Sequence, residues 1–233
     1  MNLPFFYISD YDPSQKEIVL DEDTSRHVVQ VLRMKIGEQL NLTDGKGSLL
    51  TCKLIEEHKK HCRVQQLSIS ESPAPKKNVS IAVSLLKNPS RFEWFLEKAT
   101  EIGVTEIIPL ICKRTEKEKF RYDRMQQICI SAMLQSKRVW LPILHEPMQF
   151  DDISSWKSTN AKHFIAHCNE EEKQPLSNLT KTESSQILIG PEGDFTNAEI
   201  ELALENGFIP VSLGESRLRT ETAALVAAVL LSS

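Results

Sequence analysis

The spacing of apolar residues changes once along this chain, near residue 75, and this change limits the possible folds more than any other feature. Before it, short segments alternate apolar and polar residues, which is the period of half-buried strands. Three such segments are 39–43, 49–55 and 63–69. Thr24 is placed to cap a short helix over 25–33. We therefore expect the first part to be a small β-rich barrel or sandwich with one helix.

After the change, near-continuous apolar strands alternate with longer helical stripes, as in an α/β domain with a mostly parallel sheet. The expected strands are 79–86, 106–111, 163–168, 186–189 and 210–213. The expected helices are 91–102, 122–138, 197–206 and 221–231. A stretch with two prolines and no apolar period separates the two parts and is typical of an exposed linker. The predicted domains are thus 1–70 and 79–233, joined by a linker over 71–78.

Composition and missing motifs exclude several classes of protein. With 40% hydrophobic and 26% charged residues, the chain does not belong to the disordered class. Its longest apolar run, 223–231, is too short to cross a bilayer, so no membrane partner is expected. The five cysteines are odd in number and never spaced C-x-x-C, which predicts reduced thiols in a cytoplasmic protein without a metal site. No dinucleotide-binding or P-loop glycine motif occurs.

Charge is distributed unevenly along the chain. The net charge is -4 at pH 7, yet residues 76–140 carry thirteen basic and seven acidic side chains. A basic patch on an acidic protein indicates a polyanionic partner. The alternative is that this segment is only a solvated face of the fold.

A glycine turn follows the predicted strand 186–189. Gly190 and Gly193 bring bare backbone groups to the carboxyl end of that strand, where open α/β sheets bind ligands. Thr196 and Glu199 then form a capping box for the next helix. A ligand rich in hydrogen-bonding edges, such as an adenosine, would suit this turn. The alternative is a tight turn without a ligand.

A second turn of the same kind follows the strand 210–213. Gly214 opens it, and Arg217 and Arg219 precede a helix over 223–231 that is apolar on every side. Such a helix must be buried all round, by its own domain or by a second subunit. Charged residues at the start of a buried helix are costly unless they pair or serve a ligand. Both readings, a ligand site and an Arg/Glu network that stabilises the fold, remain open at this point.

Four motifs in this order resemble the RsmE family. They are Glu-Lys-Ala-Thr-Glu-Ile-Gly-Val at 97–104, Gln-Ser-Lys-Arg at 135–138, Gly-Pro-Glu-Gly-Asp-Phe at 190–195 and Leu-Arg-Thr-Glu-Thr-Ala at 218–223. This family comprises bacterial 16S ribosomal RNA methyltransferases of the SPOUT class, which methylate N3 of one uridine. Residues 27–33 and 37–47 are similar to its small PUA-like RNA-binding domain.

The resemblance implies a fold, a cofactor and partners. The fold would be a knotted SPOUT methyltransferase domain with a mostly parallel sheet, preceded by a PUA-like β-barrel. The cofactor would be S-adenosyl-L-methionine (SAM), bent within the knot loops. The partners would be 16S ribosomal RNA within the assembled 30S subunit and a second copy of the chain. Two alternatives remain: a SPOUT enzyme that acts on transfer RNA, and a non-enzymatic RNA-binding dimer.

The resemblance also implies site residues. Those for the cofactor are Ala166, His167, Leu188, Ile189, Gly190, Pro191, Glu192, Gly193, Ser212, Leu213, Gly214 and Leu218. Arg219 would stabilise the charge that develops on the uracil during methyl transfer. The general base stays open between Glu192 and Glu221. The expected RNA contacts are His27, Arg33, Arg91, Arg114 and Arg138.

The chain also departs from the family pattern. The family usually has acidic residues where Ser131 and Leu134 stand, and a small residue where Lys137 stands. Asp194 replaces a commoner glycine. These differences bear on the RNA-side contacts and on one loop of the cofactor site.

Overall fold

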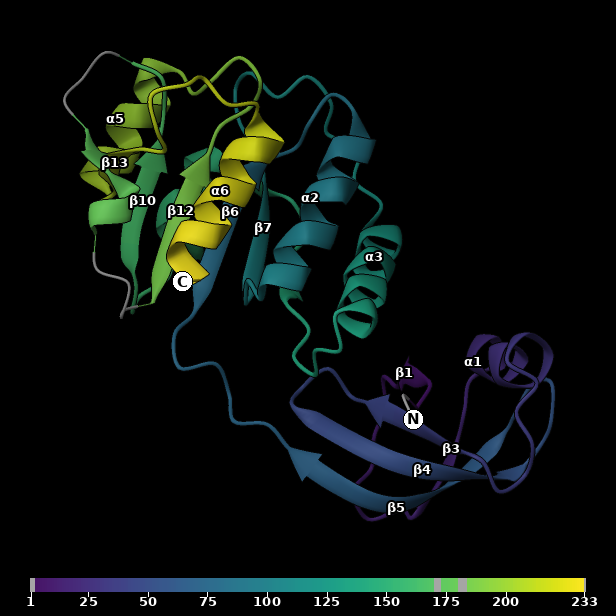
Figure 1. The fold of residues 1–233 in the computed structure, drawn as a ribbon. Coiled ribbons are helices and arrows are strands. Elements are labelled where there is room, and N and C mark those ends of the chain that lie inside the picture. Colours follow the sequence, from purple (N-terminus) through teal and green to yellow (C-terminus); the bar gives the residue numbers. More distant parts are fainter. Residues whose placement is uncertain (1–2, 170–172, 180–183, 233) are drawn as a thin grey trace. The chain divides into compact units, whose positions relative to one another are not determined.

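The computed structural model of the chain describes residues 3–169, 173–179 and 184–232 (Figure 1). The described residues form two compact units. The first comprises the chain up to Ala74 together with Met133–Leu141, and the second comprises Pro75–Ala132 and the chain from Pro142 onward. Each unit has its own buried core.

The first unit is a curled five-stranded sheet in the order β1-β3-β4-β5-β2. Its strands are β1 (Phe5–Tyr7), β2 (Glu17–Val19), β3 (Gln39–Thr43), β4 (Ser48–Glu56) and β5 (Arg63–Glu71). The β1–β3 pair is parallel and the other pairs are antiparallel. Two register shifts between β4 and β5 bend these long strands, as bulges do. Leu40, Leu42, Leu50 and Leu54 alternate into the core, as the period of two predicts.

The helical part of this unit begins earlier than the sequence predicts. Helix α1 spans Glu22–Arg26, and a π-turn, η1, follows over His27–Val31. Asp21 is the N-cap, because its carboxylate accepts the backbone N–H of Thr24 at 2.9 Å. The prediction that Thr24 caps the helix is therefore wrong. Aspartate and threonine are both good N-caps. Leu20, immediately before Asp21, is buried in the core, so the helix begins at Asp21, where the chain leaves the core.

A segment distant in sequence completes the first unit. Gly47 donates its N–H to Val139 O, and Leu141 donates to Gly45 O, both at 2.8 Å. A Cβ at Gly47 would lie 2.5 Å from the Trp140 ring, and Gly47 has a φ of 106°. Only glycine fits this close approach in the left-handed region.

The second unit is a parallel sheet in the order β11-β13-β10-β12-β6-β7-β8, with β9 also paired to β7. Its strands are β6 (Val79–Ser84), β7 (Glu106–Ile111), β8 (Ile143–Leu144), β9 (Met148–Gln149), β10 (Lys162–Ala166), β11 (Gln174–Pro175), β12 (Ser185–Ile189) and β13 (Ile209–Ser212). The central strands β6 and β12 are buried along their whole length, which explains their near-continuous apolar sequence.

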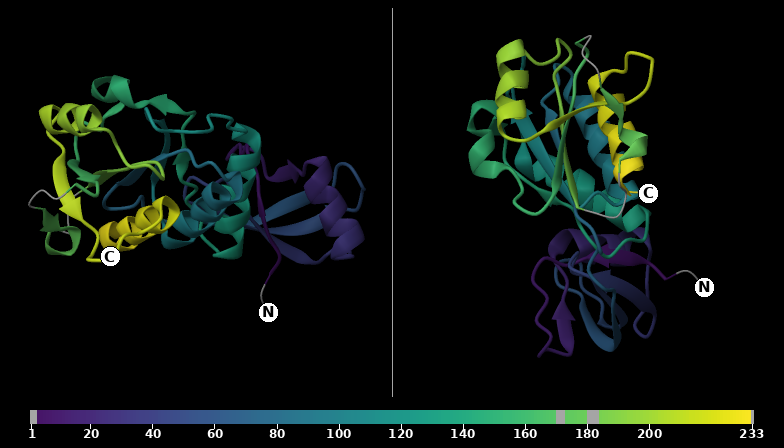
Figure 2. Two further views of the ribbon diagram at one scale, coloured as in Figure 1. Left: turned by 90° about the horizontal axis from the view of Figure 1, so that it is seen from above. Right: turned by 90° about the vertical axis from the view of Figure 1, so that its left-hand side faces the viewer.

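Helices cover both faces of this sheet (Figure 2, right). The helices after α1 are α2 (Pro89–Ile102), α3 (Tyr122–Gln135), α4 (Ile153–Trp156), α5 (Asn197–Glu205) and α6 (Thr220–Ser232), with 3-10 turns η2 (Phe150–Asp152) and η3 (Leu176–Asn178). On one face, α4, η2 and α5 pack over Ala82, Ile108 and Leu188. On the other face, α6 lies against β6, β12 and α2.

The path from β13 to α6 places the loops of the site. Strand β13 pairs with β10, whereas α6 packs beyond it on β12 and β6. The segment 213–219 must therefore cross the carboxyl ends of β10 and β12 (Figure 1). Open α/β sheets bind ligands at these ends.

Helix α6 is not buried all round within this chain. Ala224, Ala227, Ala228 and Leu231 form its core stripe, whereas Val229 is 47% exposed. Burial of every side of α6 would thus require a surface beyond those that the described residues supply.

Candidate functional site

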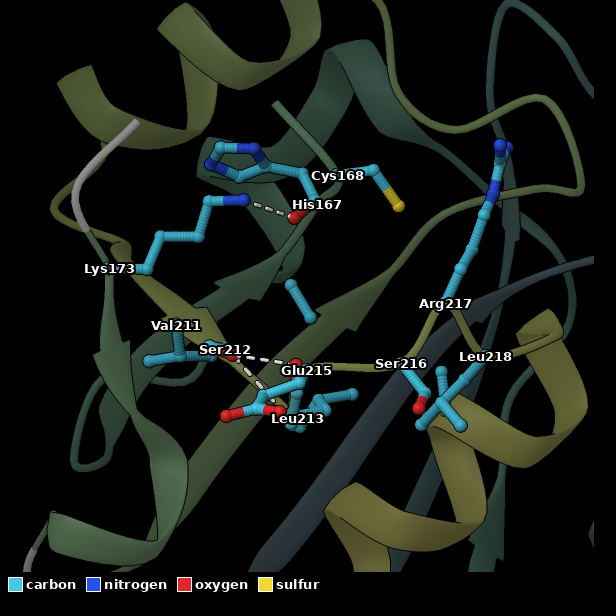
Figure 3. A pocket seen from close by; sticks show the side chains of 13 residues that line it. His167, Cys168, Lys173, Val211, Ser212, Leu213, Glu215, Ser216, Arg217 and Leu218 are labelled. Carbon is cyan, nitrogen blue, oxygen red and sulfur yellow. Dashed lines mark hydrogen bonds between the residues drawn. The ribbon is translucent and has the colours of Figure 1, made fainter. Parts of the chain in front are cut away.

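Two adjoining pockets lie where three loops meet at the carboxyl ends of β10, β12 and β13. The first has a volume of about 410 Å³ and is shown in Figure 3. Its lining is Ala166, His167, Cys168, Lys173, Val211, Ser212, Leu213, Gly214, Glu215, Ser216, Arg217, Leu218 and Ala223. The Lys173 ammonium donates to the backbone carbonyl of His167 at 2.5 Å, which ties β11 to the end of β10.

The second pocket has a volume of about 280 Å³ and lies on the β12 side. Its lining is Ala166, Cys168, Ile189, Gly190, Pro191, Glu192, Asp194, Arg217, Leu218, Arg219, Thr220 and Ala223. The two pockets share Ala166, Cys168, Arg217, Leu218 and Ala223, so they are parts of one cleft.

The loop after β12, residues 190–195, has local reasons for its shape. A Cβ on Gly190 would lie 3.1 Å from both the backbone nitrogen and a ring carbon of Phe195. Phe195 is 2% exposed and packs against Phe150, so it has little room to yield. Glycine at 190 thus lets the loop fold tightly over a buried ring. The predicted capping box of Thr196 and Glu199 is present and fixes the start of α5.

The side chains of Arg114 and Asp194 tie this loop to other parts of the second unit. The Arg114 guanidinium donates to Gly193 O at 2.7 Å and to Phe195 O at 3.3 Å. The Asp194 carboxylate accepts the backbone N–H of Cys168 at 2.7 Å, which joins the β12 loop to the β10 loop. It also accepts the N–H of Phe195 at 2.8 Å.

Charged groups surround the thiol of Cys168 in the cleft. Burial raises the pKa of this thiol, and the Asp194 carboxylate raises it further, whereas Arg217 and Lys173 lower it. Cys168 is exposed, while the other four cysteines are buried. Because Cys168 is the exposed cysteine and lines the cleft, the reactivity of its thiol reports on the charges there.

Arg219 faces the second pocket from the start of α6. Its side chain is exposed, and no ion pair or hydrogen bond engages its guanidinium among the residues that the structure describes. Glu221 is buried, and the nitrogen near it is Arg91 Nε, at 3.7 Å. The Arg/Glu network left open by the sequence is therefore formed by Arg91 and Glu221, and not by Arg219.

Comparison with known proteins identifies the family. Residues 72–232 match the RNA methyltransferase domain family, and residues 20–67 match the RNA methyltransferase PUA domain. Ribosomal RNA small subunit methyltransferase E of Rickettsia conorii is 30% identical over 95% of this chain and 91% of its own length. The protein of that name from Buchnera aphidicola is 32% identical over 97% of this chain and 91% of its own length.

The chain belongs to the ribosomal RNA small subunit methyltransferase E family.

Solved structures of similar proteins agree with this family. A probable rRNA methyltransferase from Porphyromonas gingivalis has a TM-score of 0.89 and 37% identity, covering 97% of this chain and 95% of its own. Ribosomal RNA small subunit methyltransferase E from Neisseria gonorrhoeae, bound to S-adenosyl methionine, has a TM-score of 0.86 and 30% identity with the same coverage. The predicted RsmE family, the SPOUT-type α/β fold with a PUA-like domain, and the cofactor SAM are confirmed.

The cleft suits the cofactor of this family. The two pockets together reach the size of ordinary small-molecule sites. Their walls are mostly loop backbone, which offers N–H and C=O groups to the polar edges of an adenosine. The residues present therefore fit SAM.

Most of the residues that sequence reasoning proposed for the cofactor lie in this cleft. Ten of them line a pocket: Ala166, His167, Ile189, Gly190, Pro191, Glu192, Ser212, Leu213, Gly214 and Leu218. Leu188 does not, because its side chain points into the core, and Gly193 lies against Arg114 instead. Sequence reasoning missed Cys168, Lys173 and Asp194. For Cys168 and Asp194, a place in a loop that follows a strand was the available signal.

The residues proposed for RNA fall into different settings. His27 and Arg33 lie in the first unit, where Arg33 is exposed with a φ of 54°, and Arg138 belongs to the segment that completes this unit. Arg91 and Arg114 lie in the second unit and contact Glu221 and the β12 loop. The sequence cannot separate the roles of Arg91, Arg114 and Arg138, because all three are arginines in the basic segment 76–140.

Within residues 3–169, 173–179 and 184–232, no group of three metal-ligating side chains is found. No helix in the described part of the chain is long and apolar enough to span a bilayer.

Proposed function

We propose that this chain transfers a methyl group from SAM to N3 of one uridine in the RNA of the small ribosomal subunit. The observation that carries this proposal is the cleft at the crossing of the β12 and β13 loops, with Arg219 on its wall. The curated relatives, which are named ribosomal RNA small subunit methyltransferase E, support the same reaction.

The chemistry sets the requirements on the side chains. SAM supplies an electrophilic methyl group on a sulfonium. Uridine N3 carries a weakly acidic imide proton, and its loss leaves negative charge on N3, O2 and O4. Arg219 is free to aim its planar guanidinium at a uracil carbonyl oxygen and stabilise that charge.

Between the two candidate bases, the geometry favours Glu192. Its side chain lines the same pocket as Arg219, and Lys87 donates a backbone N–H to it at 3.2 Å. Glu221 is buried beside Arg91 and lines neither pocket. We therefore propose that Glu192 is the general base that accepts the imide proton, and that Glu221 has a structural role.

The RNA is held by groups outside the cleft. Arg33 and Arg138 are proposed to contact phosphates, and His27 to contact a nucleotide beside the π-turn, since phosphate contacts fix the register of an RNA on a protein. The target base must leave its stack for N3 to enter the cleft. Arg114 is withdrawn from this set, because its guanidinium is bound to loop carbonyls. Arg91 is withdrawn as well, because it pairs with Glu221.

A homodimer in the cytoplasm is the proposed working form, with the assembled 30S subunit as substrate. Thr222, Leu225, Val226 and Val229 repeat at helical spacing opposite the core stripe of α6. A helix with two apolar faces is suited to pack on its own sheet and on a second copy. Trp94 on the neighbouring α2 is 42% exposed and would extend that surface.

One experiment tests the reaction and its alternatives together. Nucleosides of 16S and transfer RNA from a strain lacking this gene would be compared by mass spectrometry with those of the parent strain. Loss of one N3-methyluridine from 16S RNA, restored by the wild-type gene and not by Arg219→Ala, is expected. Loss from transfer RNA would support the tRNA alternative, and an unchanged spectrum would support the non-enzymatic one.

A further inference from the structure

Asp194 stands in a backbone conformation that side chains seldom adopt. Its φ is 64°, in the left-handed region that favours glycine, and the family usually has glycine there. Asp and Asn are the side chains that tolerate this region best. A residue kept there despite the strain is expected to gain something from its side chain.

The gain is visible in the contacts of the carboxylate. One oxygen accepts the N–H of Cys168, which lies after β10, and the other accepts the N–H of Phe195. The backbone N–H of Asp194 donates to Pro191 O at 2.9 Å and closes the turn. Asp194 thus connects two loops that approach the cleft from different strands.

Arg114 holds the same loop through its backbone carbonyls. It comes from the connection between β7 and α3 and reaches the carbonyls of Gly193 and Phe195. Its Cδ would lie 3.3 Å from a Cβ on Gly193, so the guanidinium stem packs closely on the loop. The residue between these two carbonyls is Asp194 itself.

We infer that Asp194 and Arg114 are positioning residues that hold the β12 and β10 loops at the separation that SAM requires. This inference rests on the proposed function, because it concerns the same cleft. Neither side chain needs to touch the reacting atoms. Their effect is to form the cleft before the cofactor arrives, so that binding does not have to order the loops.

The test of Asp194 uses glycine and asparagine. Asp194→Gly removes the carboxylate and also removes the backbone strain, so the protein is expected to fold at least as well as wild type. Loss of a charge-assisted hydrogen bond should weaken SAM binding about tenfold by calorimetry, with KM for SAM raised and kcat nearly unchanged. Asp194→Asn keeps one acceptor and should lose about two- to threefold.

Cys168 supplies a second readout, which checks that the Asp194 carboxylate lies beside the β10 loop. Asp194 raises the pKa of this thiol, so Asp194→Gly should speed its alkylation by iodoacetamide at pH 8 several-fold, while Arg217 and Lys173 still lower that pKa. The four buried cysteines should stay unreactive in the folded protein. Unchanged SAM affinity in Asp194→Gly would overturn the inference for Asp194, whatever the alkylation rate.

The test of Arg114 separates positioning from RNA contact. Arg114→Ala should weaken SAM binding about tenfold and leave the salt dependence of RNA binding unchanged. The matched control is Arg121→Ala, an exposed arginine on the same connection, which should leave SAM affinity at the wild-type value. Normal SAM affinity with a flatter salt dependence in Arg114→Ala would show a phosphate contact and overturn the inference for Arg114. A wild-type protein that binds no SAM would overturn the proposed function, and with it this inference.

Discussion

The loop after β12 and the loop after β13 form opposite walls of one cleft and are held very differently. The β12 loop, 190–195, is bound by Arg114, by the Asp194 carboxylate and by the capping box of α5. In the β13 loop, 213–219, the hydrogen bonds among described residues are those of the Ser212 hydroxyl with Gly214 and of Ala223 N–H with Arg219 O. Most of its residues are exposed. From this difference we expect the β12 loop to be prearranged as one wall of the cleft, and the β13 loop, the other wall, to become ordered when SAM binds.

The largest effect should come from Arg219, at the end of the loosely held wall. Arg219→Ala should slow methyl transfer roughly 10²–10³-fold while SAM affinity and melting temperature stay near wild type. Single-turnover rates and thermal melts on the same preparation measure this. Arg219→Lys should recover only part of the rate, because a point charge cannot replace a planar fork. A large drop in melting temperature with near-normal transfer by the folded fraction would mean that Arg219 is structural.

On the prearranged wall, Gly190→Ala should weaken SAM binding about tenfold and lower the melting temperature by about 2–4 °C. The new methyl group would meet the backbone nitrogen of Phe195 at 3.1 Å, and that nitrogen is already hydrogen-bonded to Asp194. Calorimetry and a thermal melt measure both effects. Wild-type SAM affinity in Gly190→Ala would show that the β12 loop can shift to accept the new methyl group. That result would contradict the contrast between the two loops.

Amide hydrogen exchange compares the two walls in one experiment. Saturating SAM should slow exchange in 213–218 several-fold more than in 190–195, because the prearranged loop has less order to gain. Mass spectrometry of peptides from each loop, with and without SAM, measures the ratio. Equal slowing in both loops would contradict the contrast.

The smallest effect is expected at Ser212. Its hydroxyl accepts the N–H of Gly214 at 3.2 Å and donates to the carbonyl of Gly214 at 3.1 Å. Ser212→Ala should weaken SAM binding about two- to threefold without changing the melting temperature, since an exposed neutral hydrogen bond contributes little. A loss as large as that of Gly190→Ala would mean that the two walls are held equally well.

Local patterns predicted local structure well. The strands at 39–43 and 106–111 have the predicted bounds, because each has a clear apolar pattern closed by polar residues. Strands β1 and β2 were missed, since three residues are too few to display a period. The cap at Asp21 was missed because two good capping residues stand three positions apart.

Local sequence patterns could not predict the contacts between distant segments. The order β10-β12-β6 and the return of the chain over it depend on long-range pairing that one sequence does not display. Arg114 lies in a basic stretch, and its charge suggested a phosphate partner. The structure shows that the chemistry of its guanidinium is used on backbone carbonyls instead. The resemblance supplied the fold and predicted the cofactor loops, and the geometry supplied the contacts of Asp194, Arg114 and Arg91.

The crossing segment has a consequence for how the protein matures. Along the chain, 213–219 and α6 come after every strand of the sheet, so the ribosome synthesises them last among the parts that form the cleft. A nascent chain can therefore pair all its strands and still have no cofactor site. We expect affinity for SAM to arise only when α6 has docked on β6 and β12. SAM binding is thus expected to report that α6 has docked on the sheet.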